Sequence, residues 1–243
     1  MLRTQFLTGC CENTLMPEKH RVQKLLSNRG YCSRRRAEEL IKQGRVTVNN
    51  KLISIGTSAS ETDVIRVDGQ AVKPTKKIVI VFHKPADCVT ALTDKFHKTI
   101  MDYINLNERV FPVGRLDFNT SGLLLLTNDG DFANSVTHPR YQVIKTYEAR
   151  CDTVISQRIV QQLQHGMVID ERVVKCKAKL VNPNTIELTL HEGRKHIVKK
   201  LLKECGLHIV ALKRTKVGQL ALGGLKICSW KVLSEKEIEM VKG

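Results

Sequence analysis

The stretch best suited to chemistry is polar and bounded by two glycines: Gly114-Arg115-Leu116-Asp117-Phe118-Asn119-Thr120-Ser121-Gly122. Four leucines follow it directly. This order indicates a loop at the start of a buried strand, a position that commonly carries catalytic side chains. An ionised aspartate at position 117 would supply charge and nucleophilicity. An ordinary turn, in which Asp117 accepts hydrogen bonds from backbone amides, explains the spacing equally well.

The net charge indicates the class of partner. The 243 residues include 40 Lys and Arg against 24 Asp and Glu, which gives a formal net charge of +16. Such an excess favours a polyanion, and nucleic acid ahead of an anionic membrane surface. No stretch approaches the roughly 18 consecutive apolar residues that a membrane-spanning helix requires. We therefore expect a nucleic-acid partner and no membrane.

Neither the cysteines nor the histidines follow a metal-binding pattern. The eight cysteines are scattered without CxxC spacing, which is typical of reduced thiols in the cytoplasm. Asp129-Gly130-Asp131 fits a turn followed by an Asp-capped helix better than a cation site. The histidines near the polar motifs also lack ligand spacing and receive no role: His83, His138, His191 and His196.

The N-terminal part of the chain predicts a small basic module, residues 18–76, behind a flexible tail over residues 1–17. Apolar spacing predicts helices over 21–29 and 34–43, the second capped by Ser33. Short β-type segments follow, separated by turn signals at Asn49-Asn50 and Asp68-Gly69. We expect a helix-helix-hairpin domain.

Three arginines, Arg34, Arg35 and Arg36, open the second predicted helix. Cations in a first turn oppose the helix macrodipole, so phosphate contact explains them better than helix stability does. Residues 18–77 hold 14 Lys and Arg against six Asp and Glu, which is half of the net charge. These residues predict a domain that contacts a phosphate backbone.

A second domain is expected over residues 78–243, after a linker at Pro74-Thr75-Lys76-Lys77. Strands and helices alternate irregularly in it, which favours an α+β fold over a doubly wound sheet. Apolar runs predict strands over 78–82, 122–128, 146–151 and 185–190. Helices are expected over 131–137, 155–164 and 194–204.

The segment GRLDFNTSGLLLLTNDGDFAN, residues 114–134, closely resembles the signature of the ribosomal RNA pseudouridine synthases of the RsuA/RluB type. HKPADCVT at 83–90 and LHEGRKHIVKKLL at 190–202 are similar to the first and third motifs of that family. The resemblance covers residues 78–243. It implies a mixed, mainly antiparallel sheet and a cytoplasmic monomer that isomerises a specific uridine in ribosomal RNA without cofactor or metal.

The resemblance also implies roles for individual residues. Asp117 matches the catalytic carboxylate, and Tyr147, in Lys145-Thr146-Tyr147-Glu148, matches the tyrosine that packs against the target base. Lys199 stands where the family places an arginine that pairs with the aspartate. Arg115 and Arg194 are expected to contact RNA.

Two other functions remain open from the sequence. The N-terminal module resembles a small RNA-binding domain first seen in a small-subunit ribosomal protein, and it also occurs in factors that only bind RNA. A non-catalytic ribosome-associated protein is therefore one alternative. The other is a pseudoenzyme with an RNA chaperone role, because Ile197 replaces a glutamine usual in the family. The presence of Asp117, Tyr147 and Lys199 together favours the enzyme.

Overall fold

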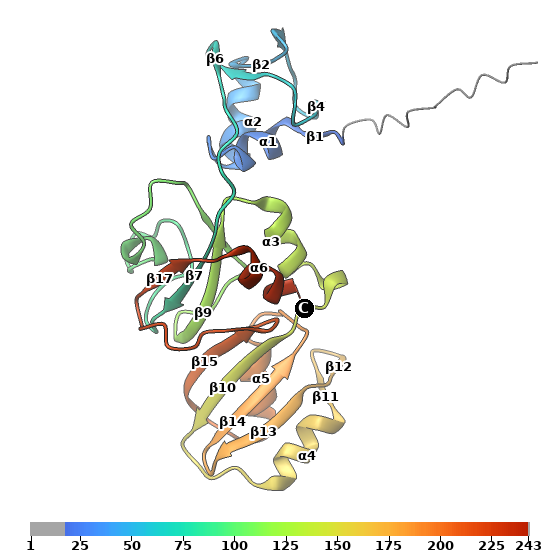
Figure 1. The fold of residues 1–243 in the computed structure, drawn as a ribbon. Helices are drawn as coiled ribbons and strands as arrows, with labels where there is room; N and C mark the ends of the chain where they lie inside the picture. Colours follow the sequence, from blue (N-terminus) through green and yellow to red (C-terminus); the bar gives the residue numbers. More distant parts are fainter. Residues whose placement is uncertain (1–17, 243) are drawn as a thin grey trace, which may run out of the picture. The chain divides into compact units, whose positions relative to one another are not determined.

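The computed structural model describes residues 18–242, so the tail expected over residues 1–17 lies outside the described residues. The chain divides after Lys73 into two compact units (Figure 1). The sequence predicted a boundary near residue 76. Each unit has a hydrophobic core of its own, and each is described separately below.

The N-terminal unit contains two helices and a small antiparallel sheet. The helices are α1 (Val22–Asn28) and α2 (Arg34–Lys42). They pack through apolar residues such as Leu25, Leu26 and Leu40 onto the sheet residues Val46 and Ile65. The sheet has the order β3-β2-β5-β6, and a separate pair joins β1 to β4. The strands are β1 (His20–Arg21), β2 (Val46–Val48), β3 (Lys51–Leu52), β4 (Ser58–Ala59), β5 (Ile65–Val67) and β6 (Gln70–Ala71).

Local signals in the sequence account for this unit. The Ser33 hydroxyl accepts a hydrogen bond from the backbone N–H of Arg36 at 3.1 Å, which confirms the predicted cap of α2. Asn49 and Asn50 have φ values of 49° and 64°, and Asp68 and Gly69 have values of 51° and 79°. Consecutive left-handed residues of these types form the tight turns that join twisted antiparallel strands.

The C-terminal unit is built on a mixed, mainly antiparallel nine-stranded sheet, as the resemblance implied. Its main path runs β13-β14-β10-β15-β9-β7-β17, with β16 paired to β15 and β8 to β9. Its strands are β7 (Val79–Lys84), β8 (Phe111–Val113), β9 (Thr120–Thr127), β10 (Lys145–Cys151), β13 (Lys177–Asn182), β14 (Thr185–Leu190), β15 (Ile209–Val217), β16 (Leu220–Ala221) and β17 (Trp230–Val232).

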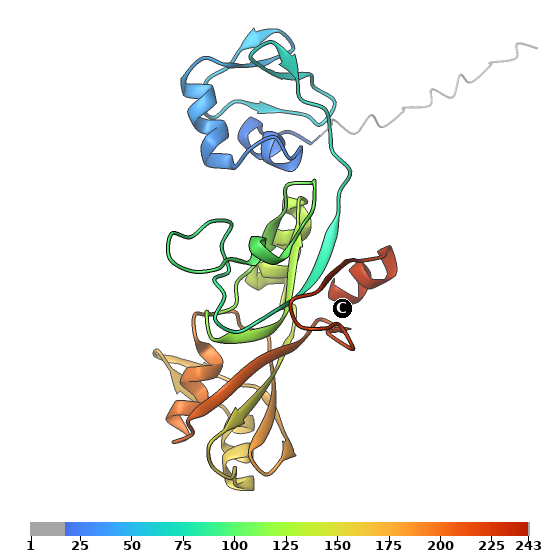
Figure 2. The ribbon, with the colours of Figure 1, turned by 90° about the vertical axis from the view of Figure 1, so that its left-hand side faces the viewer.

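Helices cover different parts of this sheet (Figures 1 and 2). Helices α4 and α5 share one core with β10, β13, β14 and β15, whereas α3 and α6 lie next to each other and share another core with β7 and β9. The remaining elements are α3 (Gly130–Thr137), α4 (Gln157–His165), α5 (Ile197–Glu204), α6 (Glu235–Lys242), the hairpin β11 (Met167–Ile169) and β12 (Arg172–Val174), and the 3-10 turns at Ile100–Tyr103 and Pro139–Tyr141.

A close approach between β9 and β15 fixes the centre of the sheet. These two strands pair in parallel, with Gly122 opposite Arg214. Gly122 has a φ of +111°, and a Cβ atom placed there would lie 2.2 Å from the carbonyl oxygen of Arg214. Only glycine fits, because a side chain would meet backbone that cannot move aside and the φ is unfavourable for L residues.

We expect Gly122→Ala to lower the free energy of unfolding by more than about 3 kcal/mol, because it combines backbone strain with a clash against the neighbouring strand. Denaturant unfolding followed by circular dichroism measures the change. Gly224→Ala is the matched control, since a Cβ atom at Gly224 has no neighbour within 4 Å. Equal stability of the two variants would contradict this account of the sheet centre.

Candidate active site

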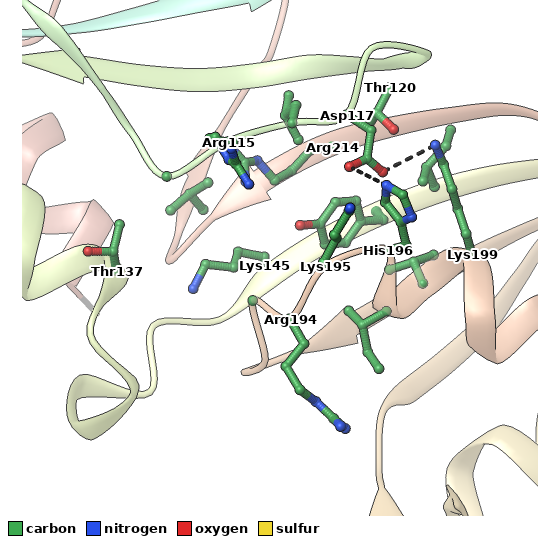
Figure 3. Close-up of a pocket in the computed structure, with 18 of the residues that line it drawn as sticks. Arg115, Asp117, Thr120, Thr137, Lys145, Arg194, Lys195, His196, Lys199 and Arg214 are labelled. Carbon is green, nitrogen blue, oxygen red and sulfur yellow. Dashed lines mark ion pairs between the residues drawn. The ribbon is translucent and has the colours of Figure 1, made fainter. Parts of the chain in front are cut away.

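A cavity of about 300 Å³ opens on the C-terminal unit (Figure 3). The loop between β8 and β9 supplies Asp117, and the neighbouring strands β10 and β15 supply Tyr147 and Arg214. The segment before α5 supplies His196, and the first turn of that helix supplies Lys199. Four segments far apart in sequence therefore meet around one carboxylate.

Asp117 lies between two basic side chains. Its Oδ2 atom is 3.1 Å from Nζ of Lys199, and its Oδ1 atom is 3.2 Å from Nε2 of His196. The Asp117 side chain is 30% exposed, so the carboxylate is oriented by these partners while an edge stays accessible to a ligand. The sequence predicted the partner Lys199 but gave no role to His196.

A buried lysine holds the backbone of the Asp117 loop. Lys84 is fully buried at the end of β7, and its Nζ atom lies within 3.2 Å of the carbonyl oxygens of Pro85, Asp117, Phe118 and Thr120. Burial lowers the pKa of Lys84 to about 8. Burial of an ammonium group is costly because the group loses its hydration. The carbonyl groups of the loop that Lys84 holds in place account for its burial.

The helix that carries Lys199 begins later than the sequence predicted. We expected a helix from residue 194, but α5 starts at Ile197. His196 adopts a left-handed conformation with a φ of 59°, which ends the preceding loop and turns its ring toward Asp117. Ile197 and Val198 are buried in the core that α5 shares with the sheet. Ile197 also lines the cavity.

Tyr147 lies half-buried in the wall of the cavity. It is opposite Arg214 in the pairing of β10 with β15. Arg214 is 4% exposed, and its Nε atom donates a hydrogen bond of 2.8 Å to the carbonyl oxygen of Leu123. The phenol ring of Tyr147 offers a flat apolar surface in the cavity wall that a planar base can contact.

The arginines with expected RNA contacts lie in different surroundings. Arg115 is exposed at the cavity. Arg194 also lines it, but its guanidinium points away from Asp117 and bonds to Glu192 at 2.6 Å and to the carbonyl oxygen of Ile169 (Figure 3). In the N-terminal unit, three consecutive arginines of α2 are exposed, and the last is paired at 2.8 Å with Glu39: Arg34, Arg35 and Arg36.

Several cavity residues escaped the sequence analysis. His196 lacked a metal-ligand pattern, and Arg214 belongs to a strand, β15, that was not predicted. The hydroxyl of Thr120 is buried in the cavity wall without a hydrogen-bond partner. Spacing offered one clue, because Thr120 follows Asp117 by three residues within the same polar stretch.

The described residues offer no cluster of three or more His, Cys, Asp or Glu side chains that could hold a metal ion. Between residues 18 and 242, no helix combines the length and the apolar character needed to cross a membrane.

We expect Lys84→Met to lower the turnover of the uridine isomerisation that the motif resemblance implies by at least about tenfold, and to leave affinity for the expected RNA within about twofold. The substitution removes the charged donor that orders three carbonyl groups of the Asp117 loop. Single-turnover product formation and filter binding measure the two effects. Lys236→Met removes an exposed lysine of α6 and should leave both values unchanged. Equal turnover of the two variants would show that the loop keeps its conformation without Lys84.

Known family models match both units. A model described as RNA pseudouridylate synthase matches residues 78–204, and one described as the S4 domain matches residues 20–65. These matches define an RNA-modifying enzyme with an RNA-binding domain ahead of its catalytic domain. The chain belongs to the RNA pseudouridylate synthase family. The predicted family, fold class and enzyme class are thereby confirmed.

Individual relatives agree with this membership. The chain is 41% identical to an uncharacterized RNA pseudouridine synthase of Aquifex aeolicus, over 90% of this chain and 92% of that protein. It is 36% identical to ribosomal large subunit pseudouridine synthase B of Bacillus subtilis, over 91% and 95% of the two chains. A crystal structure of a pseudouridylate synthase matches it with a TM-score of 0.68 and 26% identity, over 91% and 99% of the two chains.

Proposed function

We propose that this pseudouridine synthase acts on a specific uridine of ribosomal RNA and that Asp117 is its catalytic carboxylate. The observation that carries the proposal is the position of Asp117 in an open cavity, within 3.2 Å of both Lys199 and His196. The similarity to the large-subunit enzyme of Bacillus subtilis supports ribosomal RNA as the substrate.

The reaction rearranges one nucleotide. The bond between N1 of uracil and C1′ of ribose breaks, the base rotates, and a bond between C5 and C1′ forms. C5 then loses its hydrogen and N1 takes up a proton, so no electron donor or energy source is needed. A charged Asp117 can attack C1′ or assist a glycal route, and both roles require the carboxylate to stay ionised and oriented.

The other cavity residues fit supporting roles. Tyr147 would bound one face of the uracil during its rotation, and Lys199 would keep the carboxylate of Asp117 charged and in place. Taking the uridine out of its stack costs a few kcal/mol. Contacts of Arg115 and Arg194 with the RNA would offset part of that cost.

The N-terminal unit would add affinity for RNA through Arg34, Arg35 and Arg36. The three side chains are exposed on one helix, where they oppose the helix macrodipole.

We further propose that the protein works as a monomer in the cytoplasm. The described cysteines are free thiols, which fits that reducing compartment: Cys32, Cys88, Cys151, Cys176, Cys205 and Cys228.

We expect replacement of Arg34, Arg35 and Arg36 by glutamine to reduce the slope of log affinity against log salt concentration by about 2. Each lost phosphate contact removes about 0.7 to 0.9 from that slope. Filter binding of a ribosomal RNA fragment at several salt concentrations measures it. Replacement of Lys42, Lys51 and Lys73 by glutamine is the control, since these exposed lysines carry the same charge. Equal slopes for the two triple variants would show that the arginines make no special contacts.

Mapping of pseudouridines in ribosomal RNA tests the proposed substrate. RNA is compared from cells with the gene, without it, and with the gene encoding Asp117→Asn. We expect one or a few pseudouridines to disappear in the second and third strains. Identical maps in all three strains would overturn ribosomal RNA as the substrate.

A further inference from the structure

Two cations in the cavity wall have no acidic partner in the part of the chain that the structure describes. Lys145 and Tyr147 are two residues apart on β10, and Tyr147 is opposite Arg214 on β15. Both cations line the same cavity as Asp117. In the view of Figure 3, Lys145 lies near Thr137, on the opposite side of the cavity from the Asp117–Lys199 pair. Besides the carboxylate of Asp117, the cavity therefore holds two further cations, called the cationic pair below: Lys145 and Arg214.

Among residues 18–242, the cationic pair donates its hydrogen bonds to neutral carbonyl oxygens. Nζ of Lys145 donates a hydrogen bond of 2.8 Å to the carbonyl oxygen of Val143. Nε of Arg214 donates one of 2.8 Å to the carbonyl oxygen of Leu123. Neither side chain takes part in an ion pair in this part of the chain, and Asp117 is already held by Lys199 and His196. The guanidinium of Arg214 thus keeps donors for which residues 18–242 provide no hydrogen-bond acceptor.

This arrangement is unfavourable for an empty cavity. Burial and the neighbouring Arg214 lower the pKa of Lys145 to about 8. Arg214 is itself only 4% exposed. Two like charges held close together on rigid strands repel each other, and neither contributes an ion pair to folding. A bound anion would offset this repulsion, because it would supply a negatively charged acceptor, which neither side chain has among residues 18–242.

We infer that Lys145 and Arg214 form an anion subsite that binds a phosphodiester group next to the target uridine. The inference rests on the proposed function, since a uridine whose C1′ reaches Asp117 belongs to a strand with a phosphate on each side of its ribose. The planar guanidinium of Arg214 matches phosphate geometry, and the lysine adds a point charge. The subsite would hold the extracted nucleotide while its base rotates against Tyr147.

A neutral-linkage experiment tests the subsite. The substrate is a ribosomal RNA fragment that the parent enzyme binds, with either natural phosphates or one methylphosphonate on the 5′ or the 3′ side of the uridine. Affinity is measured for the full-length parent, Lys145→Met, Lys145→Arg and Lys216→Met. Lys216→Met is the matched control, because Lys216 is an exposed lysine of β15 outside the cavity.

We expect one of the two neutral linkages to weaken binding to the parent about tenfold, the size of a lost charge-assisted hydrogen bond. Lys145→Met should show this loss with natural RNA and little further loss with the neutral linkage. Lys145→Arg and Lys216→Met should respond to the neutral linkage as the parent does.

Two outcomes would overturn the subsite. In the first, the parent binds both neutral-linkage RNAs as tightly as natural RNA. In the second, Lys145→Met loses as much affinity from the neutral linkage as the parent does, so that the effects of the substitution and of the linkage add. Pseudouridine formation by the parent on the natural RNA is scored separately. Normal product without coupling would reject the subsite alone, whereas absence of product would reject the proposed function.

Discussion

Asp117→Asn is expected to lower pseudouridine formation by at least about a thousandfold. The amide keeps the size and shape of the side chain but removes the negative charge and the nucleophilic oxygen that the reaction requires. Affinity for RNA should stay within a few-fold of the parent, because Asp117 is one partly exposed side chain in a cavity otherwise rich in cations.

This expectation is checked by single-turnover reactions. The RNA is digested to nucleosides and its pseudouridine content is quantified, and filter binding is run on the same preparations. The control variant must remove a carboxylate charge away from the cavity. Asp170→Asn is this control, since it removes an equal charge from an exposed carboxylate that is paired with Lys200. Equal turnover of Asp117→Asn and Asp170→Asn would remove Asp117 from the mechanism.

Lys199→Met is expected to lower turnover about 10- to 100-fold, while Lys199→Arg stays close to the parent. The 3.1 Å ion pair orients the carboxylate of Asp117, and its side chains are 32% and 30% exposed, so the loss is smaller than for a fully buried pair. Each tenfold loss of rate corresponds to about 1.4 kcal/mol of transition-state stabilisation.

His196 is the second partner of the Asp117 carboxylate, and its contribution can be tested together with that of Lys199. Because it holds the other carboxylate oxygen at 3.2 Å, the double variant Lys199→Met with His196→Gln should lose more than either single variant. Lys200→Met removes a charge from the next position of α5, where Asp170 is the partner, and should behave as the parent does. Single-turnover rates of these variants decide the matter. A Lys199→Met enzyme as fast as Lys200→Met would refute the role of the ion pair.

The sequence predicted the parts of the site that lie within continuous motifs. Asp117 stands in a glycine-bounded polar loop before an apolar strand, and that local pattern is also visible in the structure as the start of β9. Tyr147 and Lys199 came from motif resemblance. In the N-terminal unit, caps and turns such as Ser33 and Asp68-Gly69 are set by neighbouring residues, so local reasoning was sufficient there.

Parts of the site that depend on long-range packing could not be read in this way. Strand β15 carries Lys213, Arg214 and Lys216, and these charges hide its alternation of buried and exposed positions. The true start of α5 was missed because His196 carries no side-chain cap signal and adopts a left-handed conformation. Lys84 received no role from the sequence, because only the fold brings its side chain to the carbonyl groups of the Asp117 loop.

Release of tritium from C5 of uracil tests the central claim most directly. Ribosomal RNA containing C5-tritiated uridine is incubated with the purified parent and with Asp117→Asn, and released tritium is compared with the pseudouridine recovered after digestion. The account predicts release by the parent in a one-to-one ratio with pseudouridine, and none above background with Asp117→Asn. Release by Asp117→Asn at the rate of the parent, or no release by the parent from any ribosomal RNA, would contradict it.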